Sequence, residues 1–162
     1  MIKILFVCHG NICRSPMAEF VMKKLVRDLP NTSSLTAEDF EIASAATSTE
    51  EIGNSVYPPA RRMLASHGID CSGKTARQMT ANDYNHYDYI VLMDQNNLRN
   101  LRWILPRDIY EQEIKTPNKV SLLMNWVGIN RDVADPWYTG DFEATWLDVN
   151  AGCKAMLKTF CK

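Results

Sequence analysis

A cysteine and an arginine stand six residues apart near the start of the chain, in the string CHGNICRS at residues 8–15. A thiolate can attack the phosphorus of a bound phosphate, and a guanidinium fork can bind two phosphate oxygens at once. A loop wrapped around an oxyanion could place the Cys8 sulfur below the phosphorus and Arg14 on its oxygens, with backbone N–H groups stabilising both anions. The spacing alone is a weak signal, because chance gives about 0.3 such pairs in this composition.

A second string, GIDCSGKT at residues 68–75, fits the nucleotide-binding pattern G-x-x-x-x-G-K-[ST] and is much rarer by chance. That kind of loop must directly follow a strand. Residues 58–68 instead begin with two prolines and have the apolar spacing of a helix that ends at Gly68. The sequence therefore favours residues 8–15 as the phosphate loop and predicts an ordinary turn at residues 73–74.

The elements around residues 8–15 are those that position a ligand in an α/β fold. Residues 2–8 form a continuous apolar run, typical of a strand buried on both faces of a parallel sheet. Ser15 and Pro16 then provide an N-cap and a first-turn proline for a helix. Ligands of α/β sheets bind beyond the carboxyl ends of strands and against helix N-termini, so a phosphate is expected here.

The rest of the chain alternates between strand and helix patterns. We expect a loop at 30–40, strands at 41–47, 89–94 and 119–124, and helices at 58–66, 96–105 and 142–160. Cys153 and Cys161 are interpreted as core residues of the last helix. The pattern predicts one α/β domain over residues 1–162, with a Rossmann-like four-stranded parallel sheet flanked by helices and a phosphate-binding loop after the first strand.

Composition narrows the class of protein. The 162 residues suffice for one core, and 18 Lys plus Arg against 19 Asp plus Glu leave no net field to recruit nucleic acid. Apolar runs are far shorter than the ~20 residues of a membrane span, and the N-terminus is unlike a signal peptide, so a cytoplasmic protein is expected. The five cysteines are expected to be free thiols, and the three scattered histidines predict no metal site.

The string VCHGNICRSP, with DPWY at residues 135–138, resembles the low-molecular-weight protein tyrosine phosphatase family over almost the whole chain. Further matching pieces occur in the family's order: IASAAT at 42–47, HGI at 67–69, ARQ at 76–78 and MDQNN at 93–97. The resemblance implies hydrolysis of phosphotyrosine and small aryl phosphates without metal or cofactor. It also implies tyrosine-phosphorylated proteins as substrates, phosphate and other oxyanions as inhibitors, and a monomer or weak homodimer.

The resemblance implies a role for each residue of the site. Cys8 would form a phosphocysteine intermediate, Arg14 would bind the phosphate, and Asp135 would protonate the leaving oxygen and then assist water. The phosphate loop would comprise Cys8, His9, Gly10, Asn11, Ile12, Cys13, Arg14 and Ser15. Asn11, Ser15 and Ser44 would support that loop, with the Ser15 hydroxyl on the Cys8 sulfur. The slot for the phenyl ring would be walled by His9, Ile12, Glu50, Trp137 and Tyr138, and Cys13 would be a redox partner of Cys8.

Three positions depart from the family pattern. His9 replaces a commonly apolar residue, Glu50 stands where an aromatic or apolar wall is frequent, and Lys74 occupies a position often held by a loop-buttressing histidine. Substrate preference and loop support are therefore the open points.

Three alternative functions remain open at this level. Thiol-based arsenate reductases need two further cysteines, whereas the middle of the chain offers only Cys71. Relatives that act on phosphoarginine carry Thr in place of Ile12. A non-enzymatic oxyanion-binding module would have no need of Asp135.

Overall fold

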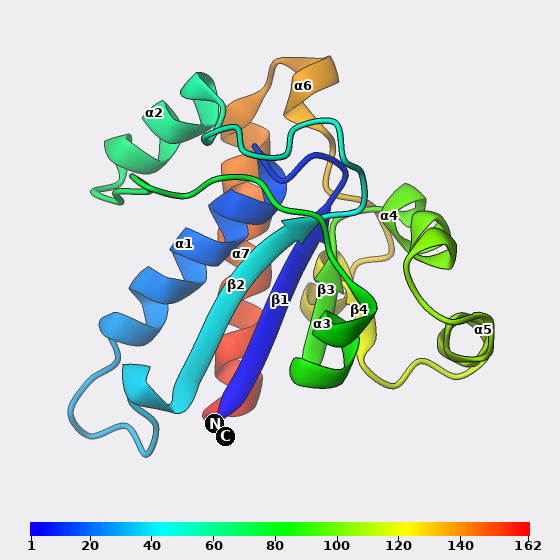
Figure 1. Cartoon of the computed structure of the whole chain (residues 1–162). Helices are drawn as coiled ribbons and strands as arrows, with labels where there is room; N and C mark the ends of the chain where they lie inside the picture. Colours follow the sequence, from blue (N-terminus) through cyan, green and yellow to red (C-terminus); the bar gives the residue numbers. More distant parts are fainter.

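Four parallel strands form the sheet, as the sequence predicts, and their order is β2-β1-β3-β4 (Figure 1). The structure is a computed structural model that describes residues 1–162. The strands are β1 Ile2–Cys8, β2 Phe40–Ala46, β3 Tyr89–Leu92 and β4 Val120–Leu122. The helices are α1 Arg14–Arg27, α2 Pro58–Ser66, α3 Ala81–His86, α4 Gln95–Asn100, α5 Arg107–Lys115, α6 Pro136–Thr139 and α7 Phe142–Phe160. Three short 3-10 helices complete the chain: η1 Ala37–Asp39, η2 Leu101–Trp103 and η3 Leu123–Val127.

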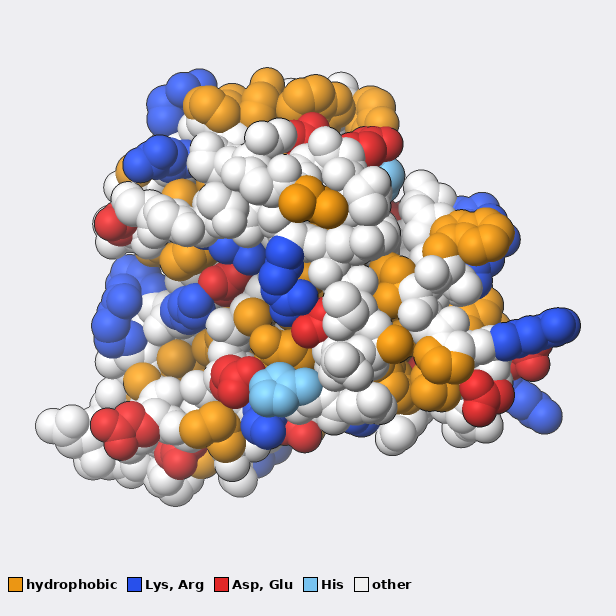
Figure 2. All heavy atoms as spheres, viewed as in Figure 1, with side chains coloured by type: hydrophobic (Ala, Val, Ile, Leu, Met, Phe, Trp, Pro, Cys, Tyr) orange, Lys and Arg blue, Asp and Glu red, His pale blue; other side chains and the backbone are white.

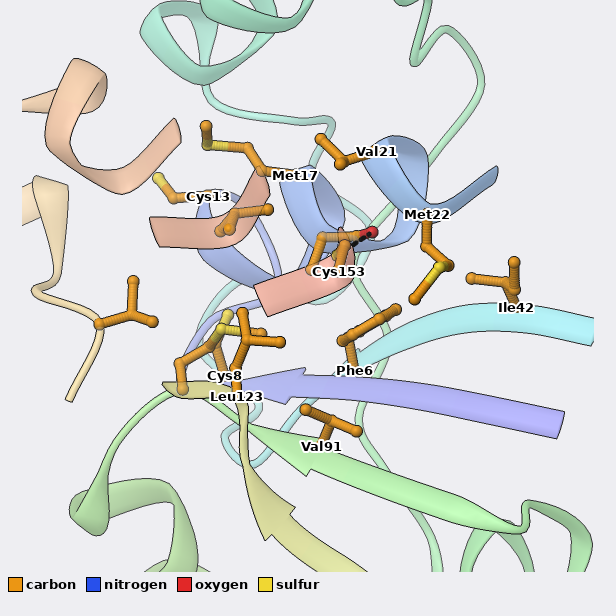
Figure 3. Close-up of a cluster of buried hydrophobic side chains, with 14 of the residues drawn as sticks. Phe6, Cys8, Cys13, Met17, Val21, Met22, Ile42, Val91, Leu123 and Cys153 are labelled. Carbon is orange, nitrogen blue, oxygen red and sulfur yellow. Dashed lines mark hydrogen bonds between the residues drawn. The ribbon is translucent and has the colours of Figure 1, made fainter. Parts of the chain in front are cut away.

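Both faces of the sheet are covered, which explains the continuous apolar run of β1. Ile4 and Phe6 face the larger core, where α1 and α7 pack side by side against the sheet. Figure 3 shows side chains of β1, α1 and α7 meeting there, with Cys153 fully buried among them, as predicted. Leu5 and Val7 face the opposite core, together with residues of η2 and α5. This two-sided burial fixes β1, and with it the loop that follows.

Several predicted boundaries are wrong by a few residues. The predicted helix 96–105 begins at Gln95, because Asp94 caps it, and changes to the 3-10 helix η2 after Asn100. The strands predicted at 41–47, 89–94 and 119–124 are one to three residues shorter or displaced. Cys161 is only partly buried, since it follows the last turn of α7.

Three short helices were not predicted from the sequence: α3, α5 and α6. α3 and α6 have only six and four residues, too few for a helical period to be visible. The nine residues of α5 are amphipathic, so the sequence carries a helical pattern there that the prediction missed.

The expected N-cap at Ser15 is also wrong. Helix α1 begins at Arg14, so Cys13 is the N-cap residue, and no side chain caps this end. The Ser15 hydroxyl is instead used inside the loop, where it contacts Asn11 and Cys8. The Ser15 hydroxyl therefore forms hydrogen bonds within the loop instead of capping the helix.

Residues 68–75 lie where the sequence predicts them. Helix α2 precedes them and ends at Ser66, and Gly68 follows its C-cap His67 with a φ of 74°, the left-handed conformation common after a helix C-terminus. No strand leads into this segment, and the next helix begins only at Ala81. The segment therefore lacks the strand–loop–helix geometry of a nucleotide-binding loop. No helix of the chain is both long and apolar enough to span a membrane.

Candidate active site

Residues 8–15 turn sharply between the carboxyl end of β1 and the first turn of α1. Asn11 adopts a φ of 59°, a left-handed conformation that is uncommon outside glycine. In this conformation its backbone N–H donates to the Cys8 sulfur at 3.3 Å. The Ser15 Oγ lies 3.0 Å from the same sulfur. The loop therefore directs two polar groups at Cys8.

A buried chain of hydrogen bonds lies behind this loop. The Arg77 backbone N–H donates to Asn11 Oδ1 at 3.2 Å, which fixes the orientation of the Asn11 amide. Asn11 Nδ2 consequently donates to both hydroxyls, Ser15 Oγ at 2.8 Å and Ser44 Oγ at 2.9 Å. Because Ser15 Oγ accepts from Asn11, its own proton can be donated to the Cys8 sulfur or to the Ala45 carbonyl, which lies 3.5 Å from Ser15 Oγ.

The chain of hydrogen bonds ends at a buried carboxylate that the sequence analysis did not identify. Ser44 Oγ donates to Glu19 Oε1 at 2.5 Å, and Glu19 is 4% exposed. Lys23 Nζ donates to Glu19 Oε2 at 2.6 Å. A glutamate on an amphipathic helix normally faces solvent, so nothing in the spacing of α1 reveals this one.

Lys74 reaches the same network from the loop after α2. Its Nζ donates to the Ser44 carbonyl at 2.9 Å and lies 3.4 Å from Glu19 Oε1. Burial lowers the pKa of Lys74, and the neighbouring Glu19 carboxylate opposes that effect. The lysine thus brings a positive charge behind the loop.

Arg14 is 2% exposed and is held by Asp94, the N-cap residue of α4, which follows the neighbouring strand β3. Its NH1 donates to Asp94 Oδ2 at 2.6 Å and to the Val133 carbonyl at 3.0 Å. Burial opposes the charge of Arg14, but the nearby Cys8 and Asp94 outweigh it, so its pKa is raised. Asp94 was not predicted as a site residue. Its position in the sequence could have identified it. Asp94 follows the apolar run of β3, which pairs with β1, and it caps α4.

Asp135 comes to the same place from the far end of the chain. It caps α6, with Oδ1 accepting from the Trp137 backbone N–H at 3.0 Å, while Oδ2 lies 3.4 Å from Arg14 NH2. One oxygen therefore orients the carboxylate and the other faces Arg14. Segments about 120 residues apart in sequence meet at this point, and DPWY provides both the turn and the carboxylate.

These residues line one cavity of about 130 Å³. It brings together the expected loop and wall residues Cys8, His9, Gly10, Ile12, Cys13, Arg14, Glu50, Asp135, Trp137 and Tyr138, and adds Glu51, which was not predicted. The Trp137 ring packs on Tyr57 with a centroid separation of 4.8 Å, and Tyr138 is 84% exposed. His9 Nε2 lies 3.0 Å from Glu50 Oε2 on the rim. Asn11, Ser15 and Ser44 lie behind the cavity rather than in its lining.

Cys13 and Cys8 line the same cavity. Burial, reinforced by the negative charge of Cys8 and Asp135, raises the pKa of Cys13 to about 12. Cys13 is therefore a neutral thiol at physiological pH. All five cysteines are free, and no group of three His, Cys, Asp or Glu side chains is placed to hold a metal ion.

Comparison with known proteins shows which family this chain is similar to. A family model described as low molecular weight phosphotyrosine protein phosphatase matches residues 3–162. The human low molecular weight phosphotyrosine protein phosphatase is 39% identical over 159 residues, covering 96% of this chain and 93% of that protein. The crystal structure of YfkJ from Bacillus subtilis superposes with a TM-score of 0.84 at 33% identity, covering 99% of this chain and 94% of that one. The crystal structure of a Drosophila arginine phosphatase gives a TM-score of 0.80 at 27% identity, with 99% of both chains covered.

Proposed function

This chain belongs to the low molecular weight phosphotyrosine protein phosphatase family, and from that premise we propose that it hydrolyses phosphotyrosine through a phosphocysteine intermediate on Cys8, without a metal. Protein tyrosine phosphatase activity follows from family membership. One observation carries the mechanism: Cys8, Arg14 and Asp135 line a single cavity. We assign the activity to one domain spanning residues 1–162, with tyrosine-phosphorylated proteins as substrates and phosphate and other oxyanions as inhibitors.

In the first step, the Cys8 thiolate attacks phosphorus and a P–S bond forms. The P–O bond to the phenol breaks, and Asp135 donates a proton to the leaving oxygen. Arg14 and the backbone N–H groups of residues 9–14 bind the phosphate oxygens and supply positive charge as it redistributes. Asp94 keeps the Arg14 guanidinium in place through the 2.6 Å hydrogen bond, so that little conformational entropy is lost when the guanidinium binds the phosphate.

In the second step, water attacks the phosphorus of phosphocysteine. Asp135, now a carboxylate, takes a proton from that water, the P–S bond breaks, and the sulfur leaves as a thiolate. The Ser15 hydroxyl, 3.0 Å from the sulfur, stabilises the thiolate as nucleophile and as leaving group. Asn11 and Ser44 hold that hydroxyl in its orientation.

The cavity walls select an aromatic substrate. Trp137 and Tyr138 provide faces for a phenyl ring, and Ile12 adds an apolar side chain of the loop itself. These faces favour the phenyl ring of phosphotyrosine, whereas Glu50 and Glu51 of the same lining are groups that pair with a guanidinium, so phosphoarginine is the competing substrate to test.

A substrate panel tests this function. Phosphate release is measured from phosphotyrosine, phosphoarginine, phosphoserine and ATP in excess EDTA, and arsenate reduction is measured with a dithiol. We expect phosphotyrosine to be hydrolysed fastest, unaffected by EDTA, with a radiolabelled phosphoenzyme trapped by rapid quench in wild type but not in Cys8→Ser. Faster release from phosphoarginine, or dependence on added metal, would contradict the proposal.

A further inference from the structure

A second hollow, of about 450 Å³, adjoins the catalytic cavity. The two share His9, Arg14, Asp135 and Tyr138, which form the ridge between them. The far wall of the second hollow comes from α4 and from the segment before α6, and includes Asn96, Asn97, Asn100 and Asp132. The hollow is therefore continuous with the rim over which a peptide must leave the slot.

The acidic groups on the two sides of the slot differ in their partners. On one rim, Glu50 pairs with His9 at 3.0 Å. In the hollow, the Asp132 carboxylate accepts only a backbone N–H, that of Gln95 at 3.1 Å. The adjacent Arg131 donates to the Asp148 carboxylate at 2.7 and 2.8 Å and to the Asp132 backbone carbonyl at 3.1 Å, but not to the Asp132 carboxylate. Asp132 consequently has no cationic partner within the chain.

The hollow also contains an unsatisfied buried amide. Asn97 is 1% exposed, and its Oδ1 accepts from the backbone N–H groups of Met93 and Asp94 at 3.0 and 3.1 Å. Its Nδ2 has no hydrogen-bond partner. A buried polar atom without a partner is unusual, and because Nδ2 can only donate, the group that fits beside it is an acceptor such as a carbonyl oxygen of a bound peptide, not the cationic end of a side chain. The hollow therefore has the character of a polar binding surface rather than a gap in packing.

Charge supports a basic occupant. Figure 2 shows acidic side chains beside hydrophobic ones at the end of the molecule where α6 lies, and basic side chains both over α1 and α2 and on the side where α4 and α5 lie. Among the side chains of the hollow, Asp94 and Asp135 face Arg14, so Asp132 is the acidic group left for a ligand. The Asn100 amide oxygen adds a further acceptor to the same wall, whereas Asn96 Oδ1 already accepts from Arg99 at 2.5 Å.

Resting on the proposed function, we infer that this hollow is the subsite for a lysine or arginine side chain directly next to the phosphotyrosine of a protein substrate. With the phosphotyrosine ring in the slot, a neighbouring side chain crosses the ridge at His9 and Tyr138 and lies in the hollow. Its cationic end reaches the Asp132 carboxylate. Asp132 thereby determines specificity without touching the reacting atoms.

The test compares phosphopeptides that carry Lys or Glu one residue before or one residue after phosphotyrosine, with alanine elsewhere. The readout is the ratio of kcat/KM for the Lys peptide to that for the Glu peptide, measured on each variant, so a general change in activity cancels. We expect wild type to prefer Lys by about threefold or more at one of the two positions, and less in 1 M salt, where the Debye length is ~3 Å. Asp132→Asn should bring that ratio close to one.

Two further variants make the result specific. Asp108→Asn removes the same charge from an exposed position on α5 and should leave the ratio unchanged. Glu50→Gln should lower the ratio less than Asp132→Asn, because Glu50 already faces His9. A wild-type ratio of one at both positions, an equal effect of Asp108→Asn, or a larger effect of Glu50→Gln would each overturn the subsite. Failure to hydrolyse free phosphotyrosine, which has no neighbouring residue, would instead reject the proposed function itself.

Discussion

Residues 8–15 and residues 68–75 both have strings typical of phosphate binding, yet the fold places them differently. The first segment joins a buried strand to a helix, and its polar groups point at the Cys8 sulfur. The second follows α2, and its Lys74 reaches the first segment from behind, through Ser44 and Glu19. The rarer string is therefore the supporting one. The difference shows that the element preceding a loop decides what its residues can reach.

The largest expected loss of activity is at Cys8 and Arg14, in residues 8–15, and no such loss is expected in residues 68–75. Cys8→Ser should reduce phosphate release to background, because a hydroxyl is a poor nucleophile here, and Arg14→Lys should be nearly as severe, because a point charge cannot replace the fork. Cys71→Ser, in the second segment, is the matched control and should retain activity. Steady-state release from phosphotyrosine measures all three. Substantial activity in Cys8→Ser, with or without metal, would reject the thiolate mechanism.

The next effect concerns the leaving group. Asp135→Asn should lower kcat on phosphotyrosine by about 10²- to 10⁴-fold, because the amide cannot donate an acidic proton. Phenols of low pKa leave without protonation, so kcat should fall much less with aryl phosphates that release such phenols. Asp70→Asn, an exposed aspartate of the second segment, provides the control. Equal losses on both kinds of substrate would remove Asp135 from the acid role.

The sequence predicted the part of this comparison that depends on local pattern. A single short segment of sequence is enough to predict each of three elements. These are β1 from its apolar run, α2 from its two prolines, and α7 from its apolar stripe. The family resemblance added Asp135, which no local pattern links to Cys8.

Long-range polar contacts could not be predicted in the same way. Glu19 and Asp94 depend on which helix face and which strand end meet the loop, and those are set by tertiary packing. The boundary at Ser15 failed because a buried network competes with helix capping for its hydroxyl.

A smaller effect tests whether the second segment supports the first. Lys74→Met removes the charge beside Glu19 and should lower kcat/KM about tenfold, the equivalent of one charge-assisted hydrogen bond. It should also slow alkylation of Cys8 by iodoacetamide at acidic pH, because the Ser15 hydroxyl is then less firmly directed at the sulfur. Lys74→Arg keeps the positive charge and should retain most of the wild-type kcat/KM and most of the wild-type alkylation rate.

Lys119→Met is the control for that experiment. Lys119 Nζ donates to the Tyr84 and Tyr87 carbonyls at 2.7 and 3.0 Å, in a network remote from Cys8. Its loss should lower thermal stability without changing alkylation of Cys8. If both lysine variants change alkylation alike, Lys74 acts only through general stability.

The first segment contains two buried cysteines, Cys8 and Cys13, the second contains one, Cys71, and oxidation should distinguish Cys13 from Cys71. Peroxide converts the Cys8 thiolate to a sulfenic acid, and the Cys13 thiol can displace water from it to form a disulfide, which a dithiol then reduces. Cys13, with a pKa raised to about 12 by burial, is not itself the first target. Cys13→Ser should recover several-fold less activity after peroxide and dithiol than wild type, whereas Cys71→Ser should recover as wild type does. Full recovery in Cys13→Ser would show that Cys13 does not protect the site.

The smallest effect concerns the backbone of the second segment. Gly73 has a φ of 85°, and a Cβ added there would meet no atom within 4 Å, so Gly73→Ala introduces conformational strain without a clash. Alanine in this conformation should lower the free energy of unfolding by about 1 kcal/mol and Tm by roughly 2–4 °C. Gly128→Ala is the matched control, since its φ of 86° is equally open and it lies in neither segment. Both variants should lose the same stability and keep wild-type kcat/KM on phosphotyrosine, because a turn that only carries Lys74 tolerates small strain. A fall in kcat/KM in Gly73→Ala alone would show that the turn itself, and not only the lysine beside it, shapes the phosphate loop.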